Sequence, residues 1–297
     1  MDNGKARCII ILSDKSSGSS IVQKELLKSP DINVLKKTRH YENESLYWIK
    51  CAAILNLQQP QIYYSEVPID KEIAENDILK LFKDNIGNYS FKNKPFSIDY
   101  LMEGWYELSK EFGPVFLEKS PHHLHSITSL GLMVKCYKNY YKNIDFKFIG
   151  LIRNPMDVLY SMWKRWSALP EFTQYDWLRA YKNLEAFKKI VKEKMIILSY
   201  EDIVSGRMKF KNICEFLNIK YTNEIGNNIH KKSINKWKND NLYGFKLSKK
   251  VLKFSNRYYQ QDDLINNKIF TGEYYRKIVS KYINLEQKIK HLARKIR

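Results

Sequence analysis

The chain has 297 residues, of which 44% are hydrophobic, and this is enough for one large α/β domain or two modest ones. Its formal net charge of +19 favours an anionic partner, such as a nucleotide, a sulfated or phosphorylated substrate, nucleic acid or an acidic membrane surface. The alternative is that much of this charge reflects an AT-rich genome, which would produce a chain rich in Lys, Asn and Ile. No apolar run approaches about 18 residues, so a membrane span is excluded. The first residues lack the features of a signal peptide, and we expect a cytoplasmic protein.

Short apolar runs alternate with helical patterns along the chain. The runs are too short for helices and do not alternate with polar residues, which is typical of strands buried on both faces of a parallel sheet. Strands are predicted at 8–12, 114–118, 146–152 and 195–200, and helices at 42–56, 99–111, 124–141 and 176–193. This order predicts a three-layer αβα fold with a central parallel sheet. With no internal repeat or low-complexity linker, residues 1–297 are predicted to form a single domain.

The four cysteines do not form a CxxC pair, and each lies among apolar or helical residues. They are predicted to be buried free thiols in a reducing compartment. They are Cys8, Cys51, Cys136 and Cys214.

The first candidate site is the loop "SDKSSGSS", residues 13–20, which follows a predicted strand. Gly18 allows a backbone conformation or a close approach that a side chain would block, and Ser19 or Ser20 can cap the following helix. The free N–H groups and the dipole of such a helix start attract phosphate. Side-chain donors are added by Lys15, Ser17, Ser19 and Ser20. An ordinary capped turn is the alternative interpretation.

Residues 60–98 are less periodic and contain Pro60, Pro68, Gly87 and Pro95. We interpret them as a loop-rich excursion that covers a substrate cleft.

The second candidate site is "RNPMDVLYS", residues 153–161, at another junction from strand to helix. Asn154 can cap the helix, Pro155 suits its first position, and Asp157 favours its dipole. Arg153 and Ser161 can converge on one anion, because the Arg guanidinium matches phosphate oxygens. Two such sites on one sheet indicate a ligand with phosphates at both ends. The loop has no Gly-Lys-Ser/Thr and no Walker B acid is evident, which argues against ATP.

Together these segments resemble the sulfotransferases that use 3′-phosphoadenosine 5′-phosphosulfate (PAPS), nearest to bacterial and glycan-type enzymes. The resemblance covers most of the chain and rests on "SDKSSGSS", "EKSP" (118–121), "RNPMDVLYS" and "LSYEDI" (198–203). It implies a P-loop-NTPase-like fold and metal-free, in-line transfer of a sulfuryl group to an acceptor hydroxyl or amine. By the resemblance, Arg153 and Ser161 hold the 3′-phosphate. The 5′-phosphosulfate is then held by Lys15, Ser16, Ser17, Gly18, Ser19 and Ser20.

One residue departs from the family pattern. The family usually has Lys or Arg directly before the Ser-Gly pair, where this chain has Ser16, and the basic residue here is Lys15. Either Lys15 reaches the bridging oxygen from one residue back, or another lysine replaces it.

The transfer requires a base for the acceptor's proton and a cation for charge on the sulfonate or bridging oxygens. The resemblance points to Glu44 or Glu42 as the base, with a slight preference for Glu44 and with His40 as a competitor. Lys119 of "EKSP" is the candidate cation, since it resembles the active-site lysine of glycan sulfotransferases. A histidine of "HHLH", His122, His123 or His125, is an alternative base. The spacing of these histidines and Pro121 argue against a metal site.

A third basic region, 230–257, has nine Lys or Arg and one acid, Asp240. It resembles a stretch that closes over the nucleotide in related bacterial enzymes. Ser233, Lys236 and Trp237 are therefore candidates for nucleotide binding, with Trp237 stacking or packing. A solvated basic loop is the alternative.

The C-terminal segment 273–297 is predicted to be an amphipathic helix that packs on the body or on another subunit. Adhesion to an anionic membrane is the alternative. Its apolar stripe consists of Ile278, Tyr282, Leu285, Ile289, Leu292 and Ile296.

The sequence thus predicts a PAPS-dependent sulfotransferase with no metal and no nucleic-acid partner. "EKSP" and the glutamates favour carbohydrate sulfation, and the basic surface is compatible with an acidic glycan. Saccharide, lipid-linked glycan, peptide tyrosine and small alcohol all stay open as acceptors. The alternative functions are a P-loop nucleotide kinase and a degenerate family member that binds nucleotide without catalysis. A nucleic-acid-binding protein would explain the charge and the 21 tyrosines, but not the two anion sites.

Overall fold

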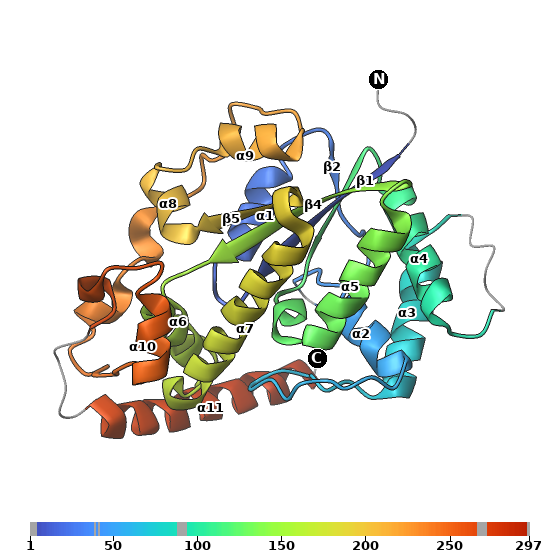
Figure 1. The fold of residues 1–297 in the computed structure, drawn as a ribbon. Helices are drawn as coiled ribbons and strands as arrows, with labels where there is room; N and C mark the ends of the chain where they lie inside the picture. Colours follow the sequence, from blue (N-terminus) through green and yellow to red (C-terminus); the bar gives the residue numbers. More distant parts are fainter. Residues whose placement is uncertain (1–4, 39, 41, 88–93, 266–271, 296–297) are drawn as a thin grey trace.

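In the computed structural model of the chain, residues 5–38, 40, 42–87, 94–265 and 272–295 are described. Within these residues, five strands form one parallel sheet in the order β2-β3-β1-β4-β5 (Figure 1). The strands are β1 (Ala6–Ser13), β2 (Ile32–Asn33), β3 (Val115–Lys119), β4 (Ile144–Ile152) and β5 (Met195–Ser199). The prediction of a three-layer αβα fold with a central parallel sheet is confirmed. Strand β2 has only two residues and was not predicted.

The residues of β1 alternate between the two faces of the sheet, as the period of a strand requires. Cys8, Ile10 and Leu12 belong to the larger core, while Ile9 and Ile11 belong to a second core on the other face. All of them are buried, because helices cover both faces. This explains why the strand sequence "CIIIL" has no polar residue.

Helices α2, α4, α5 and α7 contribute to the larger core, and α1, α8 and α9 to the second one, on opposite faces of the sheet (Figure 1). The helices are α1 (Ser19–Leu26), α2 (Tyr47–Ile54), α3 (Lys71–Asn85), α4 (Ile98–Glu111), α5 (Ile127–Tyr140), α6 (Pro155–Trp166), α7 (Pro170–Val191), α8 (Tyr200–Ser205), α9 (Phe210–Leu217), α10 (Lys249–Ser255) and α11 (Gly272–Lys295). The cysteines are free and buried, as predicted.

The predicted helix 42–56 was too long. Helix α2 covers only Tyr47–Ile54. Asn43 and Leu46 before it, and Asn56 after it, have positive φ angles, which end helical geometry. The residues before α2 are therefore irregular, and this places Glu42 and Glu44 on a loop.

The interpretation of 60–98 as loop-rich was partly wrong, because the 15-residue helix α3 lies within it. Asp70 caps α3 by accepting hydrogen bonds from the N–H groups of Glu72 and Ile73. Its buried residues recur at helical spacing: Ala74, Ile78, Leu81 and Phe82. Residues 57–69 before α3, called the strap here, contain neither helix nor strand.

Helix α11 covers Gly272–Lys295 at the place of the predicted C-terminal helix, but most of its predicted apolar stripe does not pack on the body of this chain. It lies against α6, and Tyr275 and Val279 pack on a small core that includes Trp163, Trp237 and Tyr243. The predicted stripe residues Ile278, Tyr282, Leu285 and Ile289 are exposed. Ile296 and the side chain of Leu292 lie outside what the structure describes. No described helix has the length and apolar character needed to cross a membrane.

The buried face of α3 predicts a measurable contribution to stability. Replacing Ile78, which is fully buried, with Ala should lower the free energy of unfolding by about 2–5 kcal/mol, because it leaves a cavity. Urea unfolding measures this. The control Leu79→Ala, on the side of the helix where Leu79 is 36% exposed, should cost less than about 1 kcal/mol. Equal losses would contradict the packing of α3.

Candidate active site

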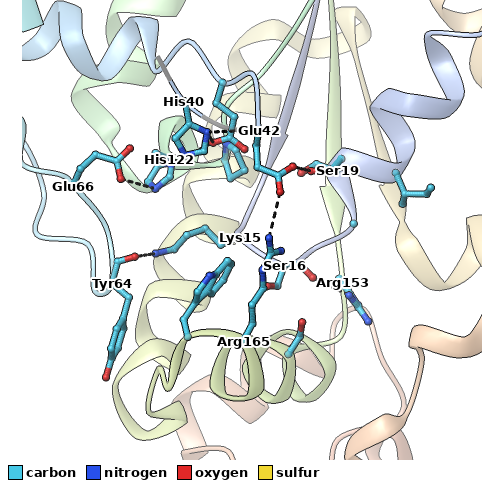
Figure 2. Close-up of a pocket in the computed structure, with 17 residues that line it drawn as sticks. Lys15, Ser16, Ser19, His40, Glu42, Tyr64, Glu66, His122, Arg153 and Arg165 are labelled. Atoms are coloured by element: carbon cyan, nitrogen blue, oxygen red, sulfur yellow. Dashed lines mark hydrogen bonds and ion pairs between the residues drawn. The ribbon is translucent and has the colours of Figure 1, made fainter. Parts of the chain in front are cut away.

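The candidate site lies at the carboxyl ends of β1, β3 and β4. Strand β1 lies between β3 and β4. After β1 the chain forms β2 and β3 on one side of it, and then β4 and β5 on the other side, so the strand order reverses at β1. A crevice at such a switch point is where open α/β sheets bind ligands. A cleft of about 490 Å³, called the main cleft here, lies at this place, and 17 residues line it (Figure 2). They include Lys15, Ser16, Gly18, Ser19, Ser20, His40, Glu42, Glu44, Arg153 and Ser161 of the predicted site.

The loop after β1 presents an open helix start to the main cleft. Gly18 has a φ of +90°, and a Cβ there would lie 2.3 Å from Cε2 of Tyr200, so the close approach requires glycine. No side chain caps α1, and its first residues Ser19 and Ser20 line the cleft. Uncapped N–H groups with the helix dipole behind them are suited to a phosphate or sulfate group.

Ser17 was predicted to hold this anion, but the structure turns it toward the core. Its Oγ is 2.8 Å from the hydroxyl oxygen of Tyr181, which in turn donates to the carbonyl of Leu151. Ser17 is fully buried and is not part of the cleft lining. Its side chain thus fastens the loop to α7 and β4.

Lys15 also differs from the prediction. Its ammonium group donates a hydrogen bond to the carbonyl oxygen of Tyr63 at 2.7 Å, in the strap. It also donates to the carbonyl oxygen of the next strap residue, Tyr64, at 3.2 Å (Figure 2). Burial lowers its pKa, although Asp14 and Asp176 nearby favour the charged form. Ser16 occupies the position where the resemblance leads us to expect Lys or Arg. It has a positive φ of 58°, and its carbonyl oxygen accepts a hydrogen bond from Arg153.

Arg153 connects the two predicted anion sites. It donates to the carbonyl oxygens of Ser16 at 2.8 Å and Ser233 at 2.7 Å, and its guanidinium lies 4.7 Å from the ring centre of Tyr200. Tyr200 is the residue against which Gly18 packs, and its hydroxyl is 2.9 Å from Ser233 Oγ. Arg153 therefore joins three segments: the loop after β1, the end of β4 and the segment around Ser233.

A second depression of about 390 Å³, called the basic groove here, continues from the main cleft. It shares Arg153, Ser161 and Arg165 with the cleft. Its lining residues are Arg153, Asp157, Tyr160, Ser161, Lys164, Arg165, Ser233 and Lys236. Four are basic and one is acidic, so the groove is suited to an anion.

Asp157 lines this groove, and Trp237 is packed in the core behind it. Asp157 accepts a hydrogen bond from the N–H of Asn235 at 2.7 Å, and burial raises its pKa to about 6 despite the charge of Arg153. Trp237 is buried with Trp163 and Tyr243, so it packs and does not line either depression. Of the three predicted residues in this segment, Ser233 and Lys236 reach the groove.

Glu44 lies at the centre of a buried polar cluster. Lys119, at the end of β3, donates to Glu44 Oε1 at 2.6 Å and to Ser20 Oγ at 3.2 Å. His122 Nδ1 is 3.7 Å and His40 Nδ1 is 3.9 Å from Glu44 Oε2. Burial would raise the pKa of Glu44, but His122 and Lys119 outweigh it and hold the pKa below its usual value.

His122 belongs to the cleft lining, unlike the other two histidines of "HHLH". Burial lowers its pKa, although Glu44 and Glu66 favour the protonated form. His123 lies 3.6 Å from the buried carboxylate of Glu118, and His125 Nε2 is 2.9 Å from Asp14 Oδ1. His123 and His125 therefore contact buried carboxylates at the carboxyl ends of β3 and β1.

Glu42 is the more exposed of the two glutamates. It receives a hydrogen bond from Ser20 at 3.3 Å and pairs with Arg165 of α6 at 3.3 Å, so it spans the cleft (Figure 2). Sequence reasoning missed Arg165, Tyr64 and Glu66 as lining residues. The signal for Arg165 was present, because it follows Ser161 by one helical turn.

Sequence comparison decides the family. The model of the Sulfotransferase family matches residues 9–223, which include both anion loops and the Glu44 cluster. The chain belongs to the sulfotransferase family. No curated protein matches the chain in sequence.

Two solved sulfotransferase domains are similar to this chain, and the first supports its fold. The sulfotransferase domain from the curacin biosynthetic pathway aligns with 84% of this chain and 96% of its own, at 16% identity and a TM-score of 0.52. The sulfotransferase domain from the Synechococcus PCC 7002 olefin synthase aligns with 75% of this chain and 77% of its own, at 18% identity and a TM-score of 0.47. The family and the first likeness confirm the predicted family and its P-loop-like fold.

The contacts of Lys15 predict that it anchors the strap. Lys15→Met removes two hydrogen bonds from a charged donor, a class worth about 1.5–3 kcal/mol each. Amide hydrogen exchange in the strap, followed by mass spectrometry, should accelerate while exchange in the sheet does not change. The control Lys24→Met, on the exposed side of α1, should leave the strap unchanged. Unaltered exchange in Lys15→Met would contradict the anchor.

Proposed function

We propose that this sulfotransferase transfers the sulfuryl group of PAPS to a hydroxyl or amine of an acceptor. The observation that carries the proposal is the pairing of two anion sites through Arg153. The uncapped start of α1 would hold the 5′-phosphosulfate, and the basic groove would hold the 3′-phosphate. The chain's own residues thus fit a nucleotide with anionic groups at both ends.

Residue roles follow from the contacts. The N–H groups of Gly18, Ser19 and Ser20 would bind the phosphosulfate, and Arg153, Ser161, Ser233 and Lys236 would surround the 3′-phosphate. Lys119, held between Glu44 and Ser20, would place positive charge behind the sulfonate. In the transfer, an acceptor oxygen or nitrogen bonds to sulfur. The bond from sulfur to the bridging oxygen breaks, and the bisphosphate leaves with that bond's electron pair.

The acceptor's proton goes to the pair of Glu44 and His122. The sequence favoured Glu44 as the base, but His122 and the ion pair with Lys119 lower the pKa of Glu44 against the effect of burial, which weakens it as a proton acceptor. His122 is largely neutral at pH 7, because burial lowers its pKa, and it lines the cleft. We therefore assign proton acceptance to His122, with Glu44 as the residue that orients it and stabilises its charged form.

A nucleotide-binding member without turnover is the second candidate. It is favoured by Ser16 and by the direction of Lys15, whose ammonium group is bonded to the strap. Binding of bisphosphate without sulfuryl transfer to any acceptor would select this alternative. The kinase alternative receives no support from the family match.

The saccharide acceptor remains a prediction from the sequence resemblance. The neighbouring structures are named for a curacin pathway and an olefin synthase, and neither name mentions a saccharide. Incubating the protein with sulfur-labelled PAPS and a panel of saccharides, lipid alcohols, phenols and amines tests this point.

Adenosine 3′,5′-bisphosphate should stabilise the protein against heat, by about 2.7 kcal/mol at one hundred times its dissociation constant. Arg153→Ala should reduce its affinity by about ten- to a hundredfold, because charged hydrogen bonds are lost. Differential scanning fluorimetry and calorimetric titration measure both effects. The control Arg207→Ala, at a side chain 71% exposed and paired with Asp202, should bind normally. The nucleotide proposal fails if the wild-type protein does not respond to the bisphosphate.

The acid side of the pH profile should identify the base. The base must be unprotonated, and burial lowers its pKa below the usual value of a histidine, so kcat/KM should fall on the acid side with a midpoint below that usual value. His122→Gln should lower turnover by about 10²–10⁴-fold and remove this fall. Glu44→Gln should shift the fall to still lower pH, because Glu44 favours the protonated form of His122. Normal turnover in His122→Gln would return the role to Glu44.

A further inference from the structure

A second cavity of about 490 Å³, called the side cavity here, lies beside the main cleft. The two spaces share His40 and Glu66 as lining residues. Glu66 Oε2 lies 4.0 Å from His122 Nε2, and His40 lies 3.9 Å from Glu44. The side cavity thus adjoins the proposed proton acceptor, while neither anion site uses it.

Three segments build the side cavity: the start of α2, the end of the strap and the first two turns of α3. Its apolar lining consists of Leu46, Pro68, Ile69 and Ile73. Leu46 and Ile69 are buried, and Ile73 is 50% exposed. An exposed isoleucine at the mouth of a cavity gives an apolar part of a ligand a surface to cover.

The charged lining is acidic. Lys50 is paired with Asp77 at 3.2 Å, and both are largely buried, so these two charges offset each other. Glu66 and Asp70 are exposed, and no other described lining residue is Lys or Arg. Asp70 is fixed in place, because its carboxylate accepts from the N–H groups of Glu72 and Ile73.

The two sides of the site therefore differ in charge. The basic groove has Lys164, Arg165 and Lys236 on the side of the proposed 3′-phosphate. The side cavity has two carboxylates without a lysine or arginine partner in its described lining. The chain as a whole has a net charge of +19, but the charged residues that line the side cavity are mostly acidic.

We propose that the side cavity binds the acceptor, and that this acceptor combines an apolar body with an uncharged or cationic head. This proposal rests on the proposed sulfuryl transfer. The apolar body lies against Leu46, Ile69 and Ile73, and the hydroxyl or amine reaches His122. Anionic groups on the acceptor would meet Glu66 and Asp70, which disfavours the acidic glycan that the overall charge suggested.

Three probes with one body and different charges test the proposal: hexyl β-glucoside, hexyl β-glucosaminide and hexyl β-glucuronide. Their binding to the full chain, saturated with adenosine 3′,5′-bisphosphate, is measured by saturation-transfer NMR titration. The uncharged and cationic glycosides should bind at least about tenfold more tightly than the glucuronide, as expected for repulsion by two nearby carboxylates. Bisphosphate stabilisation is recorded on the same sample.

Three variants connect this preference to the cavity. Glu66→Gln with Asp70→Asn removes both charges, and Asn retains the helix cap, so the preference against the glucuronide should shrink to about threefold or less. Glu72→Gln removes an exposed acid of α3 that does not line the cavity, and it should keep the full preference. Ile73→Ser should weaken the uncharged and cationic glycosides alike, because both present the hexyl chain.

Some outcomes would overturn the proposal. It fails if the glucuronide binds as tightly as the glucoside, if none of the three probes binds, or if the double variant keeps the full preference. In each case, normal stabilisation by the bisphosphate would show that the nucleotide site is intact and that only the acceptor assignment is wrong. Loss of that stabilisation in the wild-type protein would instead contradict the proposed function.

Discussion

The buried ion pair between Lys119 and Glu44 holds the site together. A lysine at the end of a central strand has no access to water here, and its charge is tolerable because Glu44 lies at 2.6 Å. The same ammonium group contacts Ser20 in the first turn of α1. One side chain thus fixes the phosphate loop, the segment before α2 and β3 relative to one another. Removing either partner would leave a buried charge, so the pair constrains the fold as well as the chemistry.

Around this pair, the site divides into regions with different electrostatics. Arg153 connects the loop after β1 with the segment near Ser233, and the basic residues gather on its side of the main cleft. On the opposite side, His122 and Glu66 lead into an acidic and apolar cavity. This division is the basis of our proposal that a nucleotide and an acceptor of different chemistry bind at adjacent positions, with the reacting groups near His122.

The central strands and the two anion loops were predictable from the sequence, because buried parallel strands read as unbroken apolar runs and helix starts have their own residue signals. The contacts of the strap and the side cavity were not. Helix α3 was missed because Pro60 and Pro68 just before it indicate a loop, and this signal outweighed the helical spacing of Ile78 and Phe82. Contacts such as that of Ser17 with Tyr181 join residues far apart in the chain, and no local pattern encodes them. For the same reason, the sequence showed Lys15 beside a phosphate loop but not its bonds to the strap.

The anchoring of the strap by Lys15 has a consequence for how this enzyme can change. Lys15 donates its hydrogen bonds to the backbone carbonyl oxygens of Tyr63 and Tyr64. Every amino acid has this group, so these bonds do not depend on the side chains at the two positions. Substitutions along the strap can therefore alter the wall of the side cavity, the proposed acceptor site, while the anchor persists. A scaffold of this kind permits new acceptor preferences to arise by drift in a few exposed positions, with the nucleotide site left as it is.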